Sequence, residues 1–249
     1  SLKIVDQLDR ASASLGFYLL SKEELHKKDY LNNMSKISEA VKTLAGMQAV
    51  KSDPATLTMV KGVEEGLVKL QGYKDRMLVY ATNDVKNVPA IGFAGTEVNP
   101  RAQTILQNLQ EMMQSESSEK VSEERRQLLL DIFSLRTNFS SSLNELRLFL
   151  AFRAETNKVN FKTYVELAEN DLVKLNKYNQ DMLTFEQQPA LENINKVYKD
   201  WRVAADKLIQ IHGAEDWRQD AFVIRKELSP LVVQIQDRLN ALVKNQQES

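Results

Sequence analysis

Arginine side chains beside apolar helical stripes are the residues of this sequence best suited to binding chemistry. Arg136 directly follows Leu135, and Arg225 directly follows Ile224. A guanidinium group can donate two parallel hydrogen bonds to a carboxylate, and a tyrosine hydroxyl can orient the bound anion. Side chains from four helical arms fall within about two turns of the same height, at about 1.5 Å of rise per residue. We therefore expect a first ligand site formed by Tyr18, Arg101, Arg136, Asn138 and Arg225. The alternative is that each arginine extends outward and pairs with a surface carboxylate.

A second group combines aromatic rings with cationic side chains on the later part of the chain. Aromatic faces attract cations, and a polar rim around an apolar floor is typical of small-molecule pockets. We expect a second site, for an amine or a carboxylate, formed by Lys174, Tyr178, Tyr198, Trp201 and Arg202. The alternative is that the rings belong to the core and the charges to the surface.

Other chemistry is poorly supported by the residue types. The chain has no cysteine, and its two histidines, His26 and His212, are far apart and do not have the spacing of metal ligands. No nucleophile motif or phosphate-binding glycine loop is present. We therefore expect no catalytic residues, no metal and no cofactor. The formal net charge of −1 also predicts no nucleic-acid partner.

The elements that must position these residues are helices. With 8 glycines and 5 prolines in 249 residues, the chain lacks the turn residues that an all-β fold would need. Apolar residues recur three and four apart along most of the chain. The pattern predicts helical runs over about 2–50, 54–87 and 119–189, and from Pro189 onward with a kink at Pro230. The segment from Val88 to Pro100, with two prolines and two glycines, is expected to be non-helical.

These runs predict an all-α, elongated antiparallel bundle in which four arms form a tall column. We expect the column to divide into two stacked four-helix modules that share long helices within one domain, residues 1–249. One module would use about residues 2–24, 98–156 and 213–246, and the other about 25–88 and 157–212. No sequence repeat between the modules is evident.

Both ends of the chain continue a helical pattern, while no run of 18 apolar residues is present. We therefore expect a domain excised from a longer protein, without its flanking transmembrane helices. The first helix, LDRASASLGFYLLSKEELHKKDY, and the last, RKELSPLVVQIQDRLNALVKNQQES, resemble the extracytoplasmic domains of bacterial chemoreceptors, the methyl-accepting chemotaxis proteins. The doubled height resembles the helical bimodular sensor type of that family.

The resemblance implies a periplasmic domain of an inner-membrane receptor that binds a small molecule, often a carboxylate, and signals by slight helix displacement as a homodimer. An arginine pair on the first helix, which some carboxylate-binding members use, is absent here, because Arg10 stands alone. Input domains of sensor histidine kinases are similar and remain an alternative. A structural helical scaffold without a small ligand is another.

Overall fold

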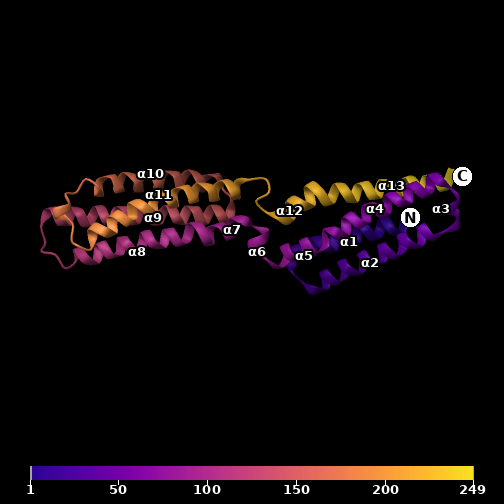
Figure 1. Ribbon diagram of the computed structural model, residues 1–249, viewed down its shortest axis with the longest axis horizontal. Coiled ribbons are helices and arrows are strands. Elements are labelled where there is room, and N and C mark those ends of the chain that lie inside the picture. Colours follow the sequence, from indigo (N-terminus) through magenta and orange to yellow (C-terminus); the bar gives the residue numbers. More distant parts are fainter. Residues whose placement is uncertain (1, 249) are drawn as a thin grey trace. The chain divides into compact units, whose positions relative to one another are not determined.

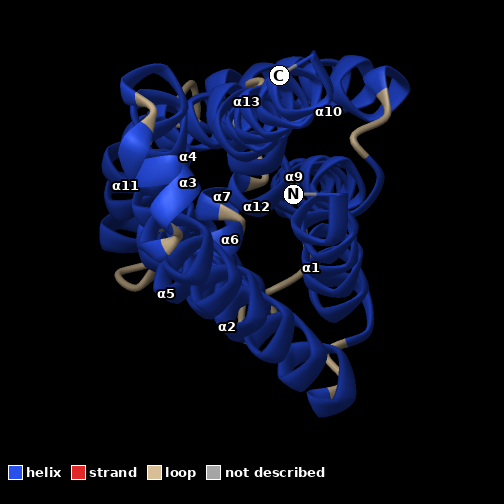
Figure 2. Cartoon of the chain, turned by 90° about the vertical axis from the view of Figure 1, so that its right-hand side faces the viewer, coloured by secondary structure: helices blue, strands red, loops and turns tan. Residues whose placement is uncertain are grey.

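The computed structural model describes residues 2–248, with side chains up to Asn245, and this range is helical apart from short connections (Figure 1 and Figure 2). No strand occurs among these residues. The expected all-α class is therefore confirmed. The chain folds as two units, each with its own core. We call them the terminal unit, formed by residues up to Asn87 and from Arg218 onward, and the central unit, formed by Val88–Trp217.

The terminal unit is a four-helix bundle in which α1 packs on α2, α2 on α4, α4 on α13 and α13 on α1. Its elements are α1 (Leu2–Ser21), α2 (Glu24–Gly46), α3 (Gln48–Ser52), α4 (Pro54–Gly72), α5 (Lys74–Thr82), α6 (Asp84–Asn87), α12 (Gln219–Val223), a π-helix (Ile224–Leu228) and α13 (Ser229–Glu248). Helix α4 begins as the sequence predicts, because the Asp53 side chain accepts hydrogen bonds from the amides of Ala55 and Thr56, and Pro54 occupies the first position.

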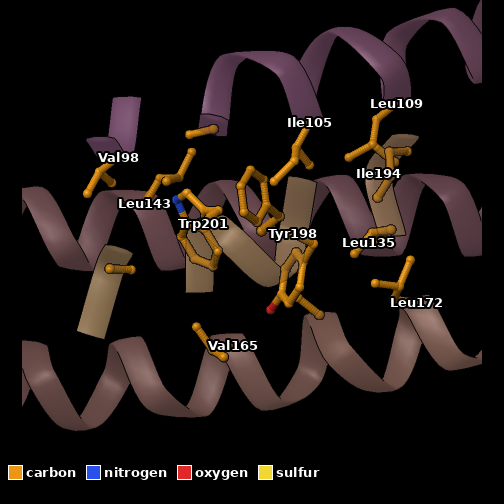
Figure 3. Packing of buried hydrophobic residues seen from close by; sticks show 14 of the residues in the cluster. Val98, Ile105, Leu109, Leu135, Leu143, Val165, Leu172, Ile194, Tyr198 and Trp201 are labelled. Atoms are coloured by element: carbon orange, nitrogen blue, oxygen red, sulfur yellow. The ribbon is translucent and has the colours of Figure 1, made fainter. Parts of the chain in front are cut away.

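The central unit is a second four-helix bundle, with contacts of α8 to α9, α9 to α10, α10 to α11 and α11 to α8. Its elements are α7 (Pro89–Phe93), a π-helix (Ala94–Val98), α8 (Asn99–Glu116), α9 (Glu123–Phe152), α10 (Glu155–Leu175), a 3-10 turn (Gln180–Met182) and α11 (Gln187–Gly213). Its core contains the Trp201, Tyr198 and Leu135 side chains shown in Figure 3.

Two tight turns divide runs that the sequence predicts to be continuous. Lys22 has a φ of 62° and Arg153 a φ of 53°, which places both residues in the left-handed region. The expected run 2–50 is therefore a hairpin of α1 and α2, and the run 119–189 contains the hairpin of α9 and α10. Both expectations were wrong, because neither turn contains the glycine or proline that usually marks one.

The segment from Val88 to Pro100 is helical, contrary to expectation. Pro89 occupies the first position of α7, where its missing N–H costs nothing. The small side chains of Ala90 and Ala94 are buried, and α7 and the π-helix both contact α11. Because small residues allow helices to approach closely, this composition supports packing here rather than a loop.

The same local arrangement occurs in both units. A short helix leads into a π-helix, and a proline stands two residues after its end, at Pro100 in the central unit and at Pro230 in the terminal unit. The amide of Asn99 donates to the carbonyl of Ala94, and that of Ser229 to the carbonyl of Ile224, so each bond spans one residue more than in an α-helix. The wider turn accommodates the proline ring, which clashes with an earlier carbonyl in a regular helix. The two units therefore share this local structural feature.

The expected module boundaries were wrong. Residues 2–24 and 98–156 were assigned to one module, yet they belong to different units, and each described helix lies within a single unit. The reason is the hairpin at each left-handed turn, which pairs a helix with its immediate successor.

Within the terminal unit, the amide of Asp220 donates to Oδ1 of Asn87 at 2.9 Å, and Arg218 pairs with the Asp220 carboxylate through Nε at 2.8 Å.

Candidate functional site

A polar cleft on the central unit, between α9 and α10, is the candidate ligand site. It has a volume of about 410 Å³ and is lined by Arg136, Thr137, Ser140, Ser141, Asn144, Glu145 and Tyr164. All but one of these side chains come from α9, and Tyr164 comes from α10. Hydroxyl, amide, guanidinium and carboxylate groups thus face one small space.

The cleft follows from the pattern of residues along α9. The side chains of Leu135, Phe139 and Leu146 point into the core and are buried. The neighbouring stripe carries Ser140 and Asn144, four residues apart, which are shorter and more polar than core residues. Because these side chains do not fill the space toward α10, a groove remains between the two helices.

Arg136 is the charged group that distinguishes this cleft. The side chain is half-buried, and its Nε is buried without a hydrogen-bond partner. No ion pair of Arg136 is found among the side chains of residues 2–245, whereas Arg125 and Arg202 each pair with nearby carboxylates. A partly buried guanidinium without a counter-ion favours an anionic ligand.

Glu145, at the other end of the cleft, does not neutralise Arg136. Its Oε2 accepts hydrogen bonds from Nδ2 of Asn157 at 2.7 Å and from Nδ2 of Asn160 at 3.5 Å. The two residues are nine positions apart on α9, which corresponds to about 13 Å along the helix axis. The Glu145 carboxylate is therefore held at the start of α10, and the guanidinium of Arg136 remains available for a ligand.

A polar network beside the cleft fixes α9 to α10. The Asp171 carboxylate is buried and accepts hydrogen bonds through Oδ2 from Ser134 Oγ and Asn138 Nδ2, both at 2.7 Å. Lys174 Nζ donates to Oδ1 of the same carboxylate at 3.3 Å. Breaking such a network leaves a buried charge unpaired, so it holds the two walls of the cleft at a defined spacing.

The first expected site is not assembled as proposed. Tyr18 and Arg225 belong to the terminal unit, whereas Arg101, Arg136 and Asn138 belong to the central unit. Tyr18 is buried in its own core, and Nη1 of Arg101 pairs with Oε2 of Glu97, in the preceding π-helix, at 2.8 Å. The expectation failed because it counted height along uninterrupted helices, and the turns at Lys22 and Arg153 reverse the chain. Arg136 alone lines the cleft, with Asn138 in the adjoining network.

The second expected set lies entirely in the central unit but does not form a polar-lipped pocket. Trp201 is fully buried and stacks edge-on against Phe139, with ring centroids 4.7 Å apart. Figure 3 shows the Trp201 and Tyr198 rings among the apolar side chains of the core. Burial, followed by the charge of Glu169, raises the pKa of Tyr198 above its ordinary value.

The charged members of that set pair with neighbours. Lys174 joins the Asp171 network, and Arg202 pairs with Glu169 at 3.5 Å and with Asp206. Tyr178 donates a hydrogen bond from its hydroxyl to Oδ2 of Asp131 at 2.7 Å, and burial and this carboxylate raise the pKa of Tyr178. The alternative stated from the sequence, core aromatics with surface charges, describes this arrangement.

Sequence reasoning missed most of the cleft. Ser140, Asn144 and Tyr164 were not selected, although the polar spacing 136, 140, 144 on one helix was a usable signal. The sequence does not reveal that α10 packs back along this stripe. The reversal of the chain occurs at Arg153, whose backbone is left-handed.

No cluster of three potential metal ligands occurs among the side chains of residues 2–245. No helix in that range is both long and apolar enough to cross a membrane. No family model matches the chain, and no curated protein matches its sequence.

Proposed function

We propose that this chain is the extracytoplasmic sensor domain of a bacterial transmembrane chemoreceptor, that it works as a homodimer, and that it binds a small organic acid in the cleft between α9 and α10. The observation that carries the proposal is the half-buried guanidinium of Arg136, which has no counter-ion among the side chains of residues 2–245 and a buried Nε without a partner. Two antiparallel four-helix bundles and the resemblance of the first and last helices support the receptor assignment.

The ligand carboxylate accepts two hydrogen bonds from Arg136 and further bonds from the hydroxyl groups of Ser140 and Tyr164. These contacts join α9 to α10, and they strengthen as the two helices approach. A ligand that binds one spacing of the helices better than another shifts the population toward that spacing. Small sliding of packed helices is a known way to transmit such a change.

The test is a thermal-shift screen of the whole chain against mono- and dicarboxylates, amino acids and amines, with calorimetric confirmation. A ligand at 100 times its dissociation constant stabilises the fold by about 2.7 kcal/mol. Arg136→Ala should abolish the shift produced by any acid, and Arg136→Lys should weaken it, because an ammonium group cannot form the bidentate contact.

Arg147→Ala provides a matched control, since Arg147 is an exposed arginine on the same helix. It should bind the acid as tightly as the unchanged chain. If no acid binds, or if Arg136→Ala and Arg147→Ala lose binding equally, the cleft is not the ligand site. A scaffold without a small ligand then becomes the better description.

A further inference from the structure

The terminal unit contains a second cavity, chemically unlike the cleft at Arg136. It has a volume of about 240 Å³ and lies among α1, α2, α4 and the segment from the second π-helix into α13. Its apolar lining comprises Leu8, Ala11, Leu15, Met34, Leu70, Ile224, Leu228, Val232 and Val233, and its polar lining comprises Asp9, Ser12, Tyr30, Ser229 and Gln236.

The cavity results from an uneven fit of α13 between its two neighbours. On α4, a Cβ at Gly66 would lie 2.7 Å from Cγ1 of Ile235, and a Cβ at Gly62 would lie 2.9 Å from Nη1 of Arg238. These two glycines, four residues apart, let α13 approach α4 closely. Arg238 also donates a hydrogen bond to the carbonyl of Gly62.

On the side of α1, small residues line the space instead of filling it. Ala11 and Ser12 on α1 and Ser229 at the start of α13 all line the cavity. The result is a half-open hollow of about 240 Å³ between α1 and α13.

The mouth of the cavity combines several polar groups with the exposed side chain of Val233. Asp9, Ser12 and Ser229 are exposed, and Gln236 donates from Nε2 to Oδ1 of Asp9 at 2.7 Å, which joins α1 to α13. Deeper in, Leu8, Leu15 and Leu228 are buried apolar side chains. A ligand here would thus meet hydrogen-bonding groups at one end and hydrocarbon at the other.

The charge of the lining selects against anions. Asp9 is the acidic residue of the lining, and no lysine, arginine or histidine belongs to it. An anion entering this cavity would lose its hydration and meet a carboxylate without a compensating cation. The lining therefore disfavours anions, in contrast to the cleft at Arg136, and its buried apolar depth favours an uncharged ring over a charged group.

The volume sets the size of the ligand. An engineered protein cavity of about 150 Å³ lined by aliphatic and aromatic side chains binds benzene. The larger volume in this unit accommodates a substituted benzene or a fused bicyclic ring. A single polar group on such a ring would lie at the mouth, near Ser12 and Gln236.

We infer that the terminal unit binds an uncharged aromatic molecule of one or two rings in the cavity between α1 and α13. This inference does not depend on the proposed function, because it uses a different unit and different residues. The cavity is a ligand site in its own right, separate from the cleft at Arg136.

The test uses indole as the probe and benzoate as its anionic counterpart, with the full chain, in calorimetric titrations. Indole should bind saturably, and benzoate should bind this cavity at least about tenfold more weakly. Ser12→Leu places a branched side chain at the mouth and should weaken indole binding by about tenfold or more. Ala13→Leu is the control, since residue 13 is exposed and outside the lining.

Each outcome bears on the inference. Loss of indole binding in Ser12→Leu, with binding kept in Ala13→Leu and in Arg136→Ala, supports it. Ser229→Leu blocks the mouth from the opposite helix and repeats the test if Ser12→Leu unfolds. The inference is wrong if the unchanged chain shows no saturable indole binding, if benzoate binds the Arg136→Ala chain as tightly as indole does, or if the blocking and control variants behave alike.

Discussion

The imidazole of His212 lies in the core of the central unit, where 1% of its surface is exposed. Its Nε2 lies 3.0 Å from the carbonyl oxygen of Leu150, and its Nδ1 is buried without a partner. Arg153 donates from Nε to the carbonyl of His212 at 3.0 Å, and its guanidinium lies 4.4 Å from the ring centroid of Trp217. Burial, and then the positive charge of Arg153, lower the pKa of His212 below 6.5. Titration of this single side chain therefore affects the stability of the unit.

Acid should weaken the central unit through His212. The pKa is lower in the folded chain, so the unfolded chain binds the proton first, and the free energy of unfolding falls as the pH drops below about 6.5. His212→Gln should remove this part of the slope. The measurement is urea unfolding of both chains between about pH 5 and pH 8.

The matched control is His26→Gln, which changes a histidine in the terminal unit. It should leave the pH dependence of the central unit as it is in the unchanged chain. If His212→Gln shows the same acid destabilisation as the unchanged chain, His212 is not the titrating group.

At the scale of elements, the sequence predicts the helices well and their ends poorly. Periodic apolar residues identify the helical segments, and Asp53 with Pro54 marks the start of α4. The sequence does not reveal the hairpin turns at Lys22 and Arg153. Their left-handed backbone is formed by a lysine and an arginine, and these residue types do not usually indicate a turn. The helical content of residues 88–100 was missed because prolines at helix starts were interpreted as breakers.

The candidate site shows the same limit. Arg136 could be selected from its residue type and its position beside a core stripe. Its neighbours could not, because which helix faces that stripe depends on the reversal at Arg153. When the helices are known but the turns between them are not, it is not determined which helices pack together and therefore which polar side chains meet.

The close contact of α4 with α13 depends on Gly66. Gly66→Ala should destabilise the terminal unit by about 1–3 kcal/mol, because its Cβ would lie 2.7 Å from Cγ1 of the buried Ile235. Chemical unfolding followed by circular dichroism measures the change.

Gly72→Ala is the matched control, since no atom lies within 4 Å of a Cβ at that position at the end of α4. It should be neutral or stabilising by up to about 1 kcal/mol, because alanine favours a helix over glycine. Equal destabilisation by the two substitutions would contradict the account of the α4 and α13 contact.

At the scale of the whole molecule, the two hydrophobic cores have no residue in common. Phe139 and Trp201 belong to one, and Leu239 and Ile235 to the other. Each core is completed by helices of its own unit. The stability of one unit should therefore respond weakly to a change in the core of the other.

Calorimetric unfolding should resolve this independence. Phe139→Ala removes a fully buried ring and should lower the stability of the central unit by about 3–5 kcal/mol while leaving the other transition in place. Leu239→Ala should do the reverse, by about 2–5 kcal/mol. A single transition that both variants shift equally would show that the cores unfold as one.

The hydrogen bond between Asn87 and Asp220 has an architectural consequence. These residues flank the two points at which the chain leaves the terminal unit and returns to it, and they are in direct contact at 2.9 Å. The whole central unit is thus a cassette inserted between neighbouring positions of another bundle. A short spliced linker in place of residues 88–217 would leave every helix of the host bundle in its original order. Insertion of a bundle at such a site enlarges a protein without requiring its host to be redesigned.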